Sequence, residues 1–416
     1  MNVLAARYRE KGKRMIKVIT GNEAAAYGVL LARPDVACAY PITPQTRIPE
    51  QLAEFYAQGL LKGKFINVES EMAAIGYATG ASAGGVRVFT ATSSQGLAWM
   101  HESLHNAAGS RLPIVMAVVN RPLAAPWNLT TDQTDSLSQR DTGWLQYYCE
   151  SNQEVLDTVI QAYKISESLS LPSMVCLDGV YLSYIAESVD IPEQEKVDEY
   201  LPAYKPMFRN TGITYKVYAN RPEEAGYNLN RMADFMRAKY IQHRDEAKCF
   251  DVFLKANQEF QALFGRGYPP VEPYRCDDAE VVVVMSGSAV GTCRCVIDRL
   301  REQGHKVGLV KLKLFRPFPW KLLRDVLGGR KKIAVIERDI SVGQCGIFYQ
   351  EIKWALNTNV EHEFIPIYGF IAGLGGIDIT PKLIEKAILY TITEPPPEQE
   401  VLWLGLEDEE IRNEYT

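Results

Sequence analysis

Residues 68–95 decide the fold and read VESEMAAIGYATGASAGGVRVFTATSSQ. Two carboxylates, Glu69 and Glu71, follow a short apolar segment at residues 65–68. A run rich in alanine, glycine and serine comes next, and small residues let another backbone approach closely. An apolar segment at residues 86–89 then ends in a run of hydroxyl side chains. The pattern predicts a strand, a tightly packed helix and a second strand whose carboxyl end is polar.

Both carboxylates stand where a strand ends and a helix begins. In a parallel α/β sheet this edge carries the ligand-binding site, so Glu69 and Glu71 are candidate catalytic groups. A carboxylate in the first turn also stabilises a helix, because it interacts with the positive end of the helix dipole. The residues alone leave both interpretations open.

The composition is that of an ordinary globular protein of two or three domains, with 416 residues, 47% hydrophobic and 23% charged. A net charge of −6 argues against nucleic acid as a partner. No apolar run is long enough to span a bilayer, so we expect no membrane partner. The basic N-terminal segment lacks the apolar centre of a signal peptide, and we expect a cytoplasmic protein.

Apolar segments alternate with helical patterns along most of the chain. This alternation predicts an α/β fold with a doubly wound parallel sheet, followed by a second α/β domain. The expected strands of the first sheet are 16–20, 36–40, 65–68, 86–89, 112–119 and 172–177. The expected divisions are an N-terminal extension (1–16), a first domain (17–191), a linker and helical connector (192–278), a second domain (279–392) and an acidic tail (393–416).

Four segments carry further candidate groups. Residues 41–46 (PITPQT) form a stiff loop that presents hydroxyls at a strand end. Arg121, which follows the strand at 112–119 and precedes a proline, is either a carboxylate clamp or a surface salt-bridge residue. The long polar loop at 123–140 is typical of a functional loop. Residues 286–292 (SGSAVGT) resemble a phosphate loop but lack its lysine.

The cysteines and histidines suggest little metal chemistry. None of the eight cysteines forms a C-x-x-C pair, so we expect no zinc or iron–sulfur site in this chain. His101 and His105 match the H-E-x-x-H pattern of zinc metalloproteases, but no third ligand is evident nearby. The bland alternative is that both histidines pack on an ordinary helix.

Seven short motifs, in order along the chain, resemble the α subunit of 2-oxoacid:ferredoxin oxidoreductases of the pyruvate synthase type, with phenylglyoxylate dehydrogenases as close relatives. They are YPITP at 40–44, VESE at 68–71, FTATSSQG at 89–96, RDTG at 140–143, MSGS at 285–288, FRPFP at 315–319 and GLGG at 373–376. The resemblance covers roughly residues 17–389. It implies a pyrimidine-binding domain for thiamine diphosphate and a transketolase C-terminal-like domain.

The resemblance assigns the cofactor-binding residues. Glu71 matches the carboxylate that hydrogen-bonds the aminopyrimidine ring of thiamine diphosphate and so helps to activate the cofactor. Pro41, Ser94 and Gln95 fall in the motifs expected to line the same half of the cofactor pocket.

The resemblance also assigns a substrate pocket. Thr43 matches a loop hydroxyl near the substrate, and Arg121 matches the arginine that pairs with the substrate carboxylate. Trp127 and Asn128 are expected beside them, and Trp127 departs from the aliphatic residue expected in pyruvate-type members. A tryptophan there suits stacking on an aryl 2-oxoacid such as phenylglyoxylate, or packing against a neighbouring subunit. Pyruvate and an aryl oxoacid therefore both stay open as substrates.

The resemblance implies a division of labour among subunits. The expected reaction is oxidative decarboxylation of a 2-oxoacid with CoA to acyl-CoA and CO2, with electrons passing through iron–sulfur clusters to ferredoxin or NAD. A β subunit is expected to bind the diphosphate group and Mg2+ and to carry a [4Fe-4S] cluster. A γ subunit, a ferredoxin-like δ subunit and, where NAD is the acceptor, a flavin- or NAD-linked subunit complete the expected assembly. The alternatives are a non-catalytic scaffold subunit and the zinc metalloprotease.

Overall fold

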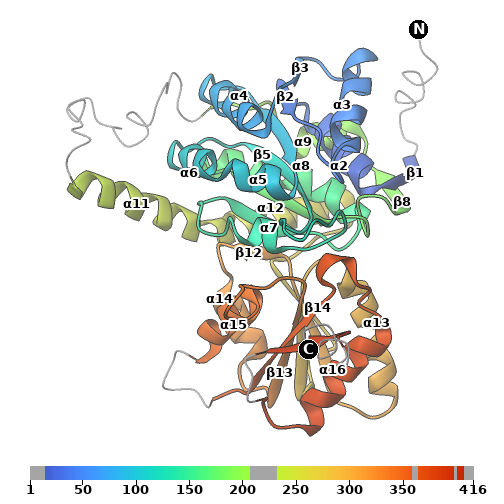
Figure 1. Cartoon of the computed structure of the whole chain (residues 1–416). Coiled ribbons are helices and arrows are strands. Elements are labelled where there is room, and N and C mark those ends of the chain that lie inside the picture. The colour runs from blue at the N-terminus through green and yellow to red at the C-terminus, as the bar shows by residue number, and fades with distance from the viewer. Residues whose placement is uncertain (1–14, 207–231, 358–363, 398–400, 407–416) are drawn as a thin grey trace.

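The fold consists of two stacked α/β units (Figure 1). The structure, a computed structural model, describes residues 15–206, 232–357, 364–397 and 401–406. The first unit, blue to green in Figure 1, is built on a seven-stranded sheet, and the second, orange to red, on a six-stranded sheet. None of the helices within these ranges is long and apolar enough to cross a bilayer.

The first sheet has the order β12-β6-β7-β5-β4-β2-β3. All neighbouring pairs are parallel except β12 and β6. The order reverses between β2 and β4, since β3 lies outside β2 while β5 and β7 continue beyond β4. Ligands bind in α/β sheets at such a reversal, outside the carboxyl ends of the strands. The strands are β2 (Val36–Ala39), β3 (Lys64–Asn67), β4 (Val88–Thr92), β5 (Val115–Asn120), β6 (Leu145–Tyr148), β7 (Ser173–Asp178) and β12 (Leu314–Arg316).

Helices cover both faces of this sheet, which confirms the doubly wound architecture. Along β5, Val115, Ala117 and Val119 point to one face, and Met116 and Val118 point to the other. The first face packs on α2 (Gly21–Ala32), α3 (Arg47–Ala57), α8 (Asn152–Leu169) and α12 (Cys249–Phe264). The second face packs on α4 (Glu71–Ala83), α5 (Ser94–Trp99) and α6 (His101–Gly109).

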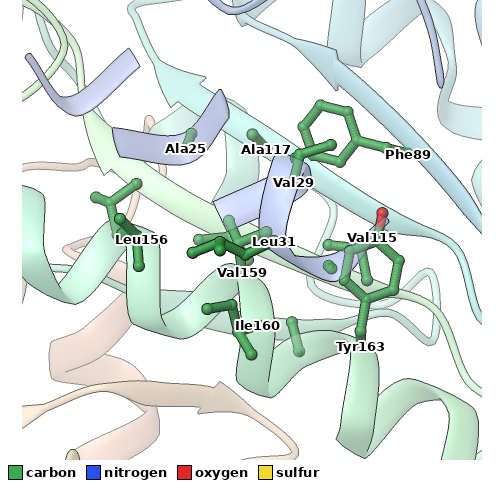
Figure 2. Packing of buried hydrophobic residues seen from close by; sticks show 14 of the residues in the cluster. Ala25, Val29, Leu31, Phe89, Val115, Ala117, Leu156, Val159, Ile160 and Tyr163 are labelled. Atoms are coloured by element: carbon green, nitrogen blue, oxygen red, sulfur yellow. The ribbon is translucent and has the colours of Figure 1, made fainter. Parts of the chain in front are cut away.

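The pairing of α2 with α8 forms the centre of the first core (Figure 2). Gly28 explains how close the two helices come, because a Cβ atom there would lie 2.7 Å from the carbonyl oxygen of Leu156. Val29 and Val159 are fully buried in the same contact, and burying such a side chain contributes about 1.5–3 kcal/mol. The alanine-rich helix α2 therefore packs tightly against α8, and the two helices together support one face of the first sheet.

The second sheet has the order β15-β14-β13-β10-β11-β9 and is parallel except where β9 pairs with β11. Helices α13 and α16 cover one face and α14 and α15 the other. The second expected α/β domain is thus confirmed. Its elements are β9 (Val271–Tyr274), β10 (Val281–Met285), α13 (Ala289–Glu302), β11 (Val307–Leu312), α14 (Trp320–Leu327), β13 (Lys332–Glu337), α15 (Ile347–Asn357), β14 (Ile367–Ala372), α16 (Pro381–Thr393) and β15 (Val401–Leu404).

The first expected strand forms but does not join the main sheet. It is β1 (Met15–Thr20), and it pairs antiparallel with β8 (Ala186–Ile191) in a separate two-stranded sheet. Its alternation explains the difference, because Val18 is 73% exposed while Ile19 is buried. A strand with one solvent-exposed face fits a small surface sheet better than a sheet whose two faces are both covered by helices.

Several elements lie where only connections were expected. Strand β9 and helix α9 (Gln194–Tyr200) lie within the expected linker, and β15 lies within the expected tail. Strand β12 comes from the second half of the chain yet pairs with β6 of the first sheet. The helical stretch expected at 223–264 is α11 (Met232–Ala247) followed by α12, and residues 223–231 lie outside the described ranges. Short strands of this kind are fixed by tertiary pairing more than by local pattern.

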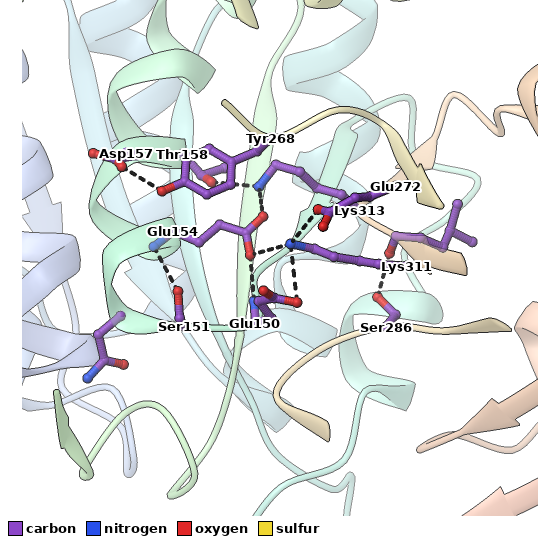
Figure 3. Close-up of polar contacts among 12 residues, drawn as sticks. Glu150, Ser151, Glu154, Asp157, Thr158, Tyr268, Glu272, Ser286, Lys311 and Lys313 are labelled. Carbon is purple, nitrogen blue, oxygen red and sulfur yellow. Dashed lines mark hydrogen bonds and ion pairs between the residues drawn. The ribbon is translucent and has the colours of Figure 1, made fainter. Parts of the chain in front are cut away.

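A buried ionic cluster joins the two units (Figure 3). Glu154 in α8 is fully buried and pairs with Lys311 at 2.9 Å and with Lys313 at 2.6 Å, both from the second half of the chain. Ser151 caps α8 by accepting a hydrogen bond from the Glu154 backbone at 3.2 Å. The Glu154 side chain accepts from the Glu150 backbone instead of completing a capping box. The S-x-x-E pattern at residues 151–154 is typical of a capping box, and the structure forms only the serine half of it.

Replacing Glu154 with glutamine is expected to cost about 3 kcal/mol of unfolding free energy near neutral pH. Burial alone would raise the pKa of Glu154, but Lys313 and Lys311 lower it from 4.5 to about 2. A lowered folded-state pKa gives stability that is present above pH 4.5 and lost as the pH falls toward 2. Urea denaturation of both proteins from pH 7 to 3.5 should therefore show a difference that narrows below about pH 5. The exposed Glu54→Gln change is the control, with an expected effect of about 1 kcal/mol or less. A difference independent of pH would contradict this account.

Candidate active site

Glu71 begins α4 at the end of β3. Ser70 caps the helix by accepting a hydrogen bond from the backbone of Ala73 at 3.1 Å. The Glu71 side chain is only 7% exposed, and within the described ranges no group donates a hydrogen bond to its carboxylate. A Cβ atom on Gly96 would lie 2.7 Å from Oε1 of Glu71, so the glycine is needed for the carboxylate to fit. Buried acids normally have partners, and this one is therefore available to a group from outside the chain.

Other buried polar atoms near the end of β4 also lack partners in the described part of the chain. They are the hydroxyls of Thr92 and Ser93 and the amide nitrogen of Gln95. Thr92 lies close to Glu71, because both would contact a Cβ atom placed on Gly96. A polar heterocycle that both donates and accepts hydrogen bonds would satisfy such a set. The residues present thus fit the aminopyrimidine ring that the sequence analysis assigned to this place.

Arg121 lies at the carboxyl end of β5 and touches three of the other predicted site residues. Its Nη1 donates to the carbonyl oxygen of Thr43 at 2.6 Å, and its Nη2 donates to Oε1 of Gln95 at 2.9 Å. Its Nε donates to the carbonyl oxygen of Asn128 at 3.1 Å. The consecutive residues Gln95 and Gly96 therefore touch Arg121 and Glu71 respectively, so the structure brings the two charged candidates to one place.

The guanidinium of Arg121 has N–H groups that the three hydrogen bonds described above do not use. It has five N–H groups, and three of them are used by the contacts above, which leaves one on Nη1 and one on Nη2. The side chain is 3% exposed, and burial lowers its pKa. No carboxylate of the described residues forms an ion pair with it, so the surface salt-bridge alternative is wrong. A substrate carboxylate would accept hydrogen bonds from these two N–H groups. Charge-assisted hydrogen bonds of this kind are strong when the guanidinium is shielded from solvent.

Asp135 organises this site, and the sequence analysis gave it no role. It is fully buried, and its carboxylate accepts from the backbone N–H groups of Ser94 at 2.9 Å and Arg121 at 3.1 Å. It also accepts from the Asn120 side chain at 2.8 Å. Burial raises the pKa of Asp135 to about 7 in spite of these donors. Asp135 thus joins the ends of β4 and β5, and only its place in the long loop hinted at this.

The loop after β2 presents its side chains outward. Pro41 and Thr43 are exposed, and the Thr43 hydroxyl forms no hydrogen bond with another described residue. The loop is held from below, because Asn22 donates to the carbonyl oxygen of Pro44 at 2.8 Å and Gln45 donates to that of Ala91 at 3.1 Å. Thr43 is therefore held in place through its backbone and leaves its hydroxyl free for an incoming molecule.

Trp127 and Asn128 follow Arg121 on the long loop. The Trp127 ring is 75% exposed, and its centroid lies 5.9 Å from the guanidinium carbon of Arg121. The Asn128 side chain points to the second unit, where it donates to the carbonyl oxygen of Gly375 at 2.9 Å. Its contact with Arg121 is through its backbone. Asn128 thus lies beside the expected pocket, but its side chain holds the loop.

The two histidines of the alternative zinc site lie on α6, with ring centroids 5.0 Å apart. Nδ1 of His101 lies 2.6 Å from Oε1 of Gln139. No group of three potential metal ligands is found among the described residues.

The phosphate-like loop at 286–292 already holds an anion from the first unit. Oδ2 of Asp178 accepts from the backbone and the hydroxyl of Ser288, at 2.9 and 2.5 Å, and from Arg338 at 3.0 Å. A Cβ atom on Gly287 would lie 2.8 Å from the same carboxylate oxygen. The loop therefore serves as a contact between the two units.

Comparison with known proteins decides the family. Residues 27–251 match the family model described as pyruvate flavodoxin/ferredoxin oxidoreductase, thiamine diphosphate-binding. Residues 279–384 match core domain II of pyruvate:ferredoxin oxidoreductase. The chain belongs to the pyruvate:ferredoxin oxidoreductase family. The resemblance drawn from the seven motifs is thus confirmed.

Relatives within this family match nearly the whole length of the chain. Pyruvate synthase subunit PorA of Methanothermobacter thermautotrophicus is 45% identical over 400 residues, which cover 95% of this chain and 99% of that protein. Ketoisovalerate oxidoreductase subunit VorA of Pyrococcus horikoshii is 46% identical over 398 residues, with 94% and 98% covered. Identity to the two kinds of subunit is thus equal, and overall similarity does not separate their substrates.

Solved structures support the fold. A 2-oxoglutarate:ferredoxin oxidoreductase from Magnetococcus marinus superposes with a TM-score of 0.71 at 22% identity. The match covers 92% of the present chain and 66% of the Magnetococcus chain. A split-gene transketolase gives a TM-score of 0.52 at 14% identity, covering 91% and 99%. At these identities the likeness concerns the fold alone, and it agrees with the two domains described above.

Proposed function

We propose that this chain is the catalytic α subunit of a multi-subunit 2-oxoacid oxidoreductase, and that it supplies the pyrimidine-binding half of a thiamine diphosphate site. The observation that carries the proposal is the buried Glu71 carboxylate, which accepts no hydrogen bond from any described residue, near a buried arginine with one unused N–H on each of its two terminal nitrogens. A scaffold subunit would have no need of either group. The reaction is the oxidative decarboxylation of a 2-oxoacid with CoA.

Thiamine diphosphate, when bound, supplies the nucleophile and the electron sink for decarboxylation. Glu71 would hold a proton between its carboxylate and a nitrogen of the aminopyrimidine. Arg121 would bind and orient the substrate carboxylate until it departs as CO2, and the Thr43 hydroxyl would lie beside the reacting oxo group. Asp135 would keep the ends of β4 and β5 in register, so that Gln95 and Arg121 stay aligned.

The site needs a second polypeptide. The segments that build the site, namely α4, α5 and the loops after β2 and β5, carry exposed aromatic and aliphatic side chains, which we call the rim and which would favour contact with another protein. These are Tyr40, Tyr77, Trp99, Trp127 and Leu129. The phosphate-like loop of the second domain is occupied by Asp178. We therefore infer that a β subunit covers this rim and binds the diphosphate and Mg2+, with iron–sulfur clusters in the β and ferredoxin-like δ subunits carrying electrons to ferredoxin or NAD. A γ subunit completes the particle.

The substrate proposed is a short aliphatic 2-oxoacid, pyruvate or 2-ketoisovalerate. The relatives that share this chain's full length at 42–46% identity are named for these two acids. One face of the Trp127 ring lies toward the Arg121 guanidinium, which leaves less of that face for stacking on an aryl group.

With the purified complex, kcat/KM for pyruvate or 2-ketoisovalerate should exceed that for phenylglyoxylate by about tenfold or more, a usual range for pocket discrimination. Trp127→Ala should change the ratio little, and a Trp99→Ala variant tests whether any loss comes from the shared rim. A preference for phenylglyoxylate that Trp127→Ala selectively abolishes would instead establish an aryl oxoacid as substrate and Trp127 as its stacking residue.

A further inference from the structure

The loop between Arg121 and α7 (Thr134–Leu137) is called the substrate loop here. The second domain contacts it through the 373–376 loop, which follows β14. The carbonyl oxygen of Gly375 accepts a hydrogen bond from Nδ2 of Asn128 at 2.9 Å and another from the Thr130 hydroxyl. The Tyr181 hydroxyl donates to the carbonyl oxygen of Gly376 at 3.0 Å. Three side chains of the first domain therefore converge on two consecutive carbonyl groups of the second.

Asn128 connects this contact to Arg121. Its side chain binds the second domain, while its carbonyl oxygen accepts from Nε of Arg121 at 3.1 Å. Its Oδ1 also accepts from the Thr130 backbone at 2.7 Å, which keeps the two loop residues together. Asn128 is thus hydrogen-bonded to Gly375 through its side chain and to the Arg121 guanidinium through its backbone, and it links the two.

The contact is too close for a side chain at Gly375 or Gly376. Gly376 has a φ of +83°, and a Cβ atom there would lie 2.5 Å from Cβ of Thr130. Gly375 has a φ of +62°, and its Cβ atom would lie 2.8 Å from Nδ2 of Asn128. Glycine is thus needed at both positions for its backbone conformation and for its lack of a side chain.

The far end of the substrate loop is held by the same domain. The backbone N–H of Gln133 donates to the carbonyl oxygen of Arg338 of the second domain at 2.9 Å. The Gln133 side chain donates to Asp178 of the first domain at 2.9 Å. The loop between Arg121 and α7 (Thr134–Leu137) is therefore fixed to the second domain at two places.

We infer that the 373–376 loop of the second domain is a positioning element for Arg121, with Asn128 and Thr130 as the positioning residues that connect them. The inference rests on the proposed function, because it takes Arg121 as the group that binds the substrate carboxylate. The second domain then sets substrate affinity without touching the substrate.

The test uses the assembled oxidoreductase with Asn128→Ala and Gly376→Ala. Asn128→Ala keeps the carbonyl group that accepts from Arg121 but releases it from Gly375. We expect each variant to raise KM for the 2-oxoacid about five- to tenfold, the size of one or two lost hydrogen bonds, with kcat and bound thiamine diphosphate nearly unchanged. Gly343→Ala is the matched control, because Gly343 has a φ of +85° and its Cβ atom would meet nothing within 4 Å.

An Arg121→Gln background separates the two ways to fail. If Arg121→Gln leaves KM unchanged, the proposed role of Arg121 is wrong. If Arg121→Gln raises KM while Asn128→Ala does not, the positioning inference is overturned. If Asn128→Ala raises KM by the same factor in both backgrounds, it acts elsewhere, and the inference is again overturned. The expected result is an effect present only when Arg121 is present. Asn128→Ala decides if Gly376→Ala does not assemble.

Discussion

Replacing Glu71 with glutamine is expected to lower turnover about a thousandfold, within the range of a lost acid–base group. Glutamine keeps the size of the side chain and a hydrogen-bonding oxygen, but it cannot hold the proton that the aminopyrimidine must share. Steady-state turnover of a 2-oxoacid by the purified complex is the measurement. Glu71→Ala should be at least as inactive.

The complex should still assemble, which distinguishes a chemical loss from a folding loss. The cap of α4 is Ser70, so removing Glu71 costs the helix only a dipole interaction of about 0.3–1 kcal/mol. Subunit content by gel filtration and the melting temperature should therefore be close to those of the parent. Glu69→Gln is the control, since Glu69 lies two residues away on the same strand end but is exposed. Turnover of Glu71→Gln within tenfold of the parent would refute the role given to this residue.

The main sheet could be predicted because its central strands are buried on both faces. Segments such as residues 112–119 are continuous apolar runs bounded by polar loops, and they correspond to strands like β5 (Val115–Asn120) in a parallel sheet. The boundaries moved by two or three residues where polar groups lie inside the sheet. β4 continues to Thr92 because Thr90 and Thr92 are fully buried, although their hydroxyls suggested a loop.

The elements that were missed are those defined by distant partners. β12 pairs with β6, which lies more than 160 residues earlier in the chain, and β15 pairs with β14 across a helix. Neither has a local pattern longer than four residues. β1 was recognised as a strand but could not be assigned to its small sheet without β8. Short strands carry little information about which sheet they join.

The candidate site divides in a similar way. Glu71 and Arg121 could be singled out because each is a charged residue at the carboxyl end of a strand, where α/β sheets bind ligands, and because the family resemblance gave each a role. Asp135 could not, because its role comes from two backbone N–H groups on different strands. Likewise, nothing in the sequence around Asn128 indicates that its side chain faces Gly375, 247 residues away. Sequence motifs therefore indicate the candidate ligand-binding side chains, but not the residues that hold those side chains in position.

Replacing Arg121 with glutamine is expected to lower kcat/KM about 10²- to 10³-fold, mainly through KM. Truncating one partner of a buried charged pair costs about 2–5 kcal/mol, much of it from leaving the other charge unpaired. Here the substrate carboxylate would lose two donors and the positive charge that carries them, and Thr43, Gln95 and Asn128 would lose the group that their oxygen atoms accept from. Initial rates over a range of 2-oxoacid concentrations measure the effect.

Arg121→Lys separates charge from geometry. Lysine keeps the positive charge, but it has no planar fork and cannot reach three fixed acceptors and a carboxylate together. We therefore expect it to recover part of the loss in KM, with an activity between the parent and Arg121→Gln. If Arg121→Lys matched the parent, a simple point charge would suffice, and the three hydrogen bonds that fix the guanidinium would have no part in binding. If both variants kept the parent's KM, the substrate carboxylate would have to bind to a cation of the partner subunit, and the site would be divided between the chains in a different way.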